Sequence, residues 1–129
     1  MAYGWDESHD AYQNYQSAEP HEASFGHELL GGAAAFGAMK MFEDHQRKEG
    51  KTVNHAFAKE LLAGFAGAEV DRLAETKGAD FIDREKAKRH ARESAERMYD
   101  DHYGRHDEYD PERHRPHERL RREYGEDRW

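Results

Sequence analysis

A chain of 129 residues with 37% charged side chains and a formal net charge of -8 has room for one domain with one core. The negative net charge argues against nucleic acid as a partner, because binding to phosphates needs clustered Lys and Arg. Two uncharged runs, residues 29–39 and 61–68, are too short for a membrane span, which takes about 20 apolar residues. The lack of cysteine excludes disulfide bonds and thiolate metal sites.

Residues 1–20 mix aromatic, polar and acidic side chains without a helical or alternating apolar period, so we expect a flexible N-terminal arm. The first ten residues, MAYGWDESHD, lack the basic patch and apolar stretch that are typical of targeting peptides. We therefore expect a cytoplasmic protein. The arm is rich in aromatic residues that could fold back over an apolar surface: Tyr3, Trp5, Tyr12 and Tyr15.

Two helices with wide apolar surfaces are predicted to follow the arm as an antiparallel hairpin. The first begins near residues 20–24 and ends at Glu49, because Gly50 is a natural helix stop. Thr52 is a suitable N-cap for the second helix, which ends near residues 76–78. Because so few residues separate the two helices, we expect them to lie side by side in opposite directions.

A third helix is predicted to begin at Asp80, its N-cap, and to run to residue 103. The three helices make a domain over residues 21–103, and the fold class is all-α. Residues 104–129 mix acidic, basic and histidine side chains with proline and glycine. We expect this segment to be a charged and largely disordered tail.

One pattern occurs twice, as HELLGGAAAFGAMK from residue 27 and as KELLAGFAGAEVDR from residue 59. Glycine costs a helix about 0.5 to 1 kcal/mol relative to alanine, so close packing must offset the glycines of both copies. Small residues one turn apart let another backbone approach closely. That backbone belongs either to the other helix of the hairpin or to a second copy of the chain, which would enlarge a small core. The predicted packing face, also the candidate oligomer face, consists of Leu29, Gly32, Phe36, Met39, Phe57, Leu61, Gly64 and Ala68.

Ten histidines raise the question of a metal site. His102 and His106 have the spacing that places two imidazoles on one helix face, but a glycine between them weakens the helix. His114 and His117 lie on either side of a proline, which opposes a rigid site. We expect solvated histidines and no metal or other cofactor, with adventitious zinc or nickel binding as the alternative. The sequence contains no nucleophile motif, phosphate loop or dinucleotide motif, so it predicts neither catalytic residues nor an enzyme.

The segment FEDHQRKEGKTVNHAFAKELLAGFAGAEVDRLAETKGADFIDREKAKRHA, together with the opening MAYGWDESHDAY, resembles the CipC-like antibiotic-response proteins of filamentous fungi. Its most specific parts are Gly-Trp-Asp near the start, EDHQRKEGK, HAFAKELLAGF and ETKGADFIDREKAKRHA. The resemblance covers roughly residues 1–103. It implies a small soluble intracellular protein linked to stress, antifungal response and hyphal growth, without an established enzymatic activity or cofactor. The tail has no counterpart in that family.

The sequence therefore favours a non-catalytic stress- and antibiotic-response protein that acts by self-association, as a homo-oligomer, or through an unidentified protein partner. A second hypothesis is a binding module for a hydrophobic small molecule or an amphipathic partner helix, because the apolar surface of the first two helices is wide. A histidine-based metal-binding protein is a third hypothesis.

Overall fold

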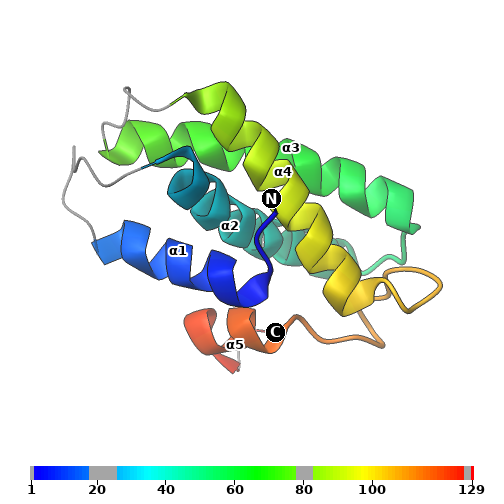
Figure 1. Cartoon of the computed structure of the whole chain (residues 1–129). Coiled ribbons are helices and arrows are strands. Elements are labelled where there is room, and N and C mark those ends of the chain that lie inside the picture. Colours follow the sequence, from blue (N-terminus) through cyan, green and yellow to red (C-terminus); the bar gives the residue numbers. More distant parts are fainter. Residues whose placement is uncertain (1, 18–25, 78–82, 127–128) are drawn as a thin grey trace.

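The computed structural model describes residues 2–17, 26–77, 83–126 and 129, which form a helical bundle (Figure 1). The predicted all-α class is confirmed. The helices of this described part follow one another as α1 (Trp5–Ser17), α2 (His27–Glu49), α3 (His55–Lys77), α4 (Arg84–Tyr103) and α5 (Glu118–Tyr124).

Helix α2 lies at the centre of the bundle and packs against α1, α3 and α4 (Figure 1). Every residue from Leu30 to Met39 is buried, because this uncharged segment is apolar or small on all sides of the helix. Its alanines and glycines let three neighbouring helices lie close to one axis. The central place of α2 thus follows from the first copy of the repeated pattern.

The predicted hairpin is confirmed in its turn and in its partners. Gly50 adopts the left-handed conformation with φ 70°, and its N–H donates to the Gln46 carbonyl at 2.8 Å. This geometry closes α2 at Glu49, as glycine does at many helix ends. Five residues then lead into α3, which packs back along α2.

The start of α3 differs from the predicted one. Asn54, rather than Thr52, caps the helix, since its Oδ1 accepts the Phe57 N–H at 2.8 Å. The residue between them, Val53, is extended and exchanges two backbone hydrogen bonds with Tyr109, at 3.0 and 2.9 Å. A contact between residues so far apart in the chain sets the helix start here, and local capping preferences did not reveal it.

Helix α4 is capped by Asp83, whose Oδ1 accepts the Lys86 N–H at 3.2 Å. The predicted cap, Asp80, lies outside the described residues, as does the predicted start of the first helix near residues 20–24. Among the described helices, none is long and apolar enough to cross a membrane.

The prediction of a flexible arm over residues 1–20 is wrong for the part that the structure describes. Residues 5–17 form α1, which packs on α2. The Trp5 indole N–H donates to the Met98 carbonyl at 2.8 Å, and the Tyr15 hydroxyl donates to the Leu73 carbonyl at 2.6 Å. The aromatic side chains therefore anchor this segment, because each combines a large apolar surface with one satisfied polar atom.

The prediction of a largely disordered tail over residues 104–129 is also wrong for its described part. Tyr109 and Leu120 are 0% exposed and belong to the same core cluster as the side chains of α2. Helix α5 lies beside α1, with which it is in contact (Figure 1). The described parts of the arm, the three-helix segment and the tail thus share one core.

Candidate functional site

The structure divides the predicted packing face between two environments. On α2, Gly32, Phe36 and Met39 are buried and Leu29 is half-buried. On α3, Phe57 is 48% exposed, and Gly64 and Ala68 are exposed. Leu61 is half-buried and packs against the core. The α3 half of the set therefore lies mostly outside the contact between the two helices.

The glycines of α2 are needed for packing within the chain. A Cβ placed on Gly31 would lie 2.9 Å from the Ala87 carbonyl oxygen and 2.7 Å from the His90 ring, both on α4. A Cβ on Gly32 would lie 2.6 Å from the Tyr3 ring. A side chain at these positions would force neighbouring atoms to move, so the helix cost of these glycines is offset by close approach.

The glycines of α3 have a different environment. Among the described residues, apart from the adjoining helix backbone, no atom lies within 4 Å of where a Cβ on Gly64 or Gly67 would be. Between Leu61 and Ala68 the outward side of α3 carries no charged residue. Phe57 lies one turn before it, and the exposed Glu60 lies between Phe57 and Gly64 on the same side of the helix. We call this surface the outer α3 face; its residues are Phe57, Leu61, Gly64, Gly67 and Ala68.

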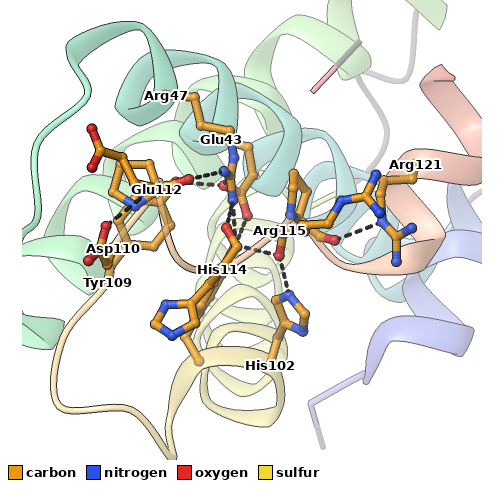
Figure 2. Close-up of polar contacts among 12 residues, drawn as sticks. Glu43, Arg47, His102, Tyr109, Asp110, Glu112, His114, Arg115 and Arg121 are labelled. Carbon is orange, nitrogen blue, oxygen red and sulfur yellow. Dashed lines mark hydrogen bonds and ion pairs between the residues drawn. The ribbon is translucent and has the colours of Figure 1, made fainter. Parts of the chain in front are cut away.

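A buried carboxylate lies in the C-terminal half of α2 (Figure 2). Glu43 is 0% exposed. Its carboxylate accepts hydrogen bonds from the hydroxyl groups of Tyr103 and Tyr109, the second at 2.7 Å, and from Arg47 Nε at 3.1 Å. We call these four side chains the Glu43 clamp. A buried carboxylate persists only when its charge is compensated in this way.

The same arginine holds the chain beyond α4 (Figure 2). Arg47 donates to the carbonyl oxygens of Pro111 at 2.7 Å and of His114 at 2.6 Å. It also lies 5.9 Å from the centre of the Tyr109 ring, within cation–π range. One guanidinium thus joins α2 to the C-terminal segment through both its charge and its hydrogen bonds.

The pKa shifts in the Glu43 clamp are those expected when buried groups bind one another and not a ligand. Burial raises the pKa of the Glu43 carboxyl, against the lowering effect of Arg47 and the two phenols. Burial, with the nearby carboxylate, raises the pKa of Tyr103 and Tyr109 far above the usual range. Both phenols therefore remain hydrogen-bond donors at neutral pH. The carboxylate has no exposed surface at which a substrate could react.

The histidines form pairs that their spacing in the sequence did not indicate. The rings of His102 and His117 are 5.2 Å apart between centroids, and those of His106 and His114 stack at 3.7 Å. Within the described residues, no group of three or more histidine and acidic side chains could hold a metal ion. Each pair joins a residue near the end of α4 to a residue just before α5.

A hollow of about 430 Å³ lies among α1, α2, α3 and α5. Its floor is formed by Gly37 and the buried Glu69, whose carboxylate receives two hydrogen bonds from Arg72, both at 2.9 Å. Lys40 and Tyr124 stand at its side, with the ammonium 5.2 Å from the ring centre. The lining combines apolar surface with three charged side chains, Lys40, Glu69 and Arg72, so it would suit a ligand that is itself partly polar.

The sequence did not reveal the Glu43 clamp. Its one local signal is the four-residue spacing of Glu43 and Arg47, which also fits an ordinary pair on a helix surface. The two tyrosines come from residues 103 and 109, at the end of the third predicted helix and in the segment expected to be a tail. Only the fold brings them to one carboxylate.

Fold and site together define a small all-helical protein whose C-terminal segment is fastened to its core by a buried ionic network. The chain belongs to the CipC-like family, since the model of the family described as "Virulence factor CipC-like" matches residues 11–102. The family resemblance predicted from the sequence is thereby confirmed. No curated protein and no solved structure gives a significant match to the chain.

Proposed function

We propose that the protein acts by self-association through the outer α3 face and catalyses no reaction. The observation that supports this proposal is the exposure of Phe57 beside a helix surface of small, uncharged residues. A large aromatic side chain next to such a surface is typical of a protein contact. Because Gly64 and Gly67 have open space above them, the backbone of a second helix could approach α3 closely.

The cellular role that we propose follows from the family. A cytoplasmic protein of the stress and antibiotic response that works as a homo-oligomer needs a contact surface and no catalytic residues. The outer α3 face supplies such a surface. An amphipathic helix of another protein would fit the same face, whereas a hydrophobic small molecule is less suited to the charged hollow beside Glu69.

Native mass spectrometry and light scattering at low micromolar concentration test this proposal. We expect a defined oligomer for the natural chain and a monomer for Gly64→Glu. The substitution fits the fold, because the position is open and glutamate is a better helix former than glycine. Ala68→Glu on the same face should give the same result.

Asn14→Glu is the matched control, since it adds the same charge at an exposed position of α1, outside the outer α3 face. This variant should keep the oligomeric state of the natural chain. A natural chain that is monomeric, or an oligomer that survives both Gly64→Glu and Ala68→Glu, would contradict the proposal.

A further inference from the structure

The chain beyond α4 runs as a strap across the end of α2 to the start of α1, and we call residues 104–124 the C-terminal strap (Figure 1). Its first half is held by Arg47 through the carbonyls of Pro111 and His114. Its second half contacts α1, where the ring of His117 stacks on Trp5 at 4.0 Å with an angle of 4° between the planes.

Two ion pairs secure the far end of the strap on α1. Arg119 Nη2 lies 2.8 Å from the Asp6 carboxylate, and His9 Nε2 lies 2.7 Å from the Glu123 carboxylate. The His9 ring itself stacks on the buried Phe36 at 4.6 Å. These contacts do not depend on a neutral imidazole in the strap, so α5 has an attachment of its own.

The attachment of residues 104–117, in contrast, depends on imidazoles in their neutral form. His117 caps α5, and its Nδ1 accepts the Arg119 backbone N–H at 3.0 Å, which a protonated ring could not do. His114 Nδ1 is buried and has no hydrogen-bond partner within the described chain. A second proton on that ring would place an N–H where no acceptor meets it.

Protonation would also bring like charges together. His106 and His114 stack at 3.7 Å, and His102 lies 5.2 Å from His117 between ring centroids. Two imidazolium ions at such distances repel, particularly where burial limits screening by water. Repulsion between His102 and His117 acts directly on the attachment, because His102 belongs to α4 and His117 to the strap. His106 and His114 both lie within the strap, so their repulsion acts on its own fold.

The acidic side chains around His117 are already engaged. The charged groups around His117 are Asp6, Glu7, Arg97, Asp101, Arg119 and Arg121, besides His102 itself. Of the three acids, Asp6 pairs with Arg119, Asp101 with Arg97 at 4.0 Å, and Glu7 accepts the Gly4 N–H at 3.0 Å. The groups around His106 and His114 are Arg47, Tyr103, Arg105, Asp107, Glu108, Asp110 and Arg113, and His55 on α3 lies 2.6 Å from the His106 carbonyl. Asp110 also has a cation close by, with Arg113 at 3.8 Å.

Burial accordingly lowers the pKa of His117 from its usual 6.5 to about 4, with His102 and Arg119 acting in the same direction. Burial also lowers the pKa of His102 and of His114. A released strap would restore the ordinary value. Docking is therefore favoured at pH above 6.5 and weakens as the pH falls toward about 4.

We propose that acid releases part of the C-terminal strap. Protonation of its imidazoles detaches residues 104–117 from α2 and from Trp5, while α1 to α4 remain folded. The ion pair between Arg119 and Asp6 opposes complete release, since neither partner is a histidine. The device is independent of self-association, because none of its residues belongs to the outer α3 face.

Trp5 provides a direct readout, because its side chain is 5% exposed and lies under the strap. The experiment uses Trp129→Phe, which leaves Trp5 as the single tryptophan of the chain. Acrylamide quenching of its fluorescence is followed from about pH 8 to about pH 4, with far-ultraviolet circular dichroism on the same samples. From His117 alone, the docking equilibrium should fall about 30-fold between pH 8 and pH 5.

We expect quenching of Trp5 to rise below about pH 6 while the helical signal stays constant. His117→Phe keeps an aromatic ring over Trp5 without a titrating nitrogen, so the midpoint should move to lower pH. His27→Phe, at the far end of α2, is the control and should leave the midpoint unchanged. Quenching that does not change with pH, or that rises only together with loss of helix, would overturn the proposal. So would a midpoint that His117→Phe leaves in place.

Discussion

At the scale of single residues, the most consequential side chain is a glutamate that no solvent reaches. Glu43 is stable in the core because Arg47, Tyr103 and Tyr109 all donate to it. The free energy of unfolding responds unequally to such a network. The intact network adds little net stability, whereas removing one partner leaves the others buried without compensation and lowers the free energy of unfolding by more than the network contributed.

Glu43→Gln should lower the free energy of unfolding by about 3 to 5 kcal/mol, because the Arg47 charge then lacks its buried counter-ion. Urea unfolding followed by circular dichroism measures the loss. Glu118→Gln is the matched control, since that carboxylate pairs with Arg122 at the surface, where both side chains are more than half exposed. Its effect should stay below about 1 kcal/mol. Equal effects of the two substitutions would contradict a structural role for the clamp.

At the scale of helices, the two copies of the repeated pattern show what sequence patterns can and cannot decide. The short connection between the two apolar helices predicted the hairpin, and the structure confirms it. On α3, however, two apolar stripes lie side by side, and only one enters the core. The stripe with Leu62, Ala66 and Val70 is buried, whereas the stripe with Phe57 and Gly64 faces outward. Periodicity alone cannot rank two such stripes, because the choice depends on where α4 packs.

The two sets of glycines should therefore respond oppositely to alanine. Gly31→Ala should lower stability by about 1 to 3 kcal/mol, because the new methyl group meets the backbone of α4 at Ala87. Gly64→Ala should raise stability by about 0.5 to 1 kcal/mol, because nothing opposes the methyl group and alanine favours the helix. Both are measured by urea unfolding at one protein concentration. An increase in stability for Gly31→Ala would contradict this prediction, because it would mean that α4 can move away from α2 without lowering the free energy of unfolding.

At the scale of the whole molecule, average composition gives a false picture of the two ends of the chain. The N-terminal segment is rich in polar side chains and the C-terminal segment in charged ones, and average polarity predicts disorder for both. A few large side chains decide otherwise: Trp5, Tyr15, Tyr109 and Leu120 each enter the core with 5% exposure or less. Their contacts join residues distant in the chain, such as Val53 with Tyr109, so no local pattern records them.

The family match ends at residue 102, whereas the core continues beyond it. A chain that ends after Tyr103 lacks Tyr109, which donates to Glu43 and packs edge-on against Phe42 at 4.9 Å between ring centroids. It also lacks the carbonyls that bind Arg47. Such a chain should keep its helices but unfold several degrees lower, since losing about 2 kcal/mol shifts the midpoint of a domain this size by roughly 5 to 15 °C.

Thermal unfolding by circular dichroism, compared with the complete chain, measures this effect. A chain ending at Gly125 is the control, because it removes only the last four residues and retains the strap through Tyr124. Equal midpoints for the chain ending at Tyr103 and the complete chain would mean that the segment beyond the family match does not stabilise the core. A lower midpoint only in the shorter chain would show that this protein depends on residues outside the family match to stabilise its own buried glutamate.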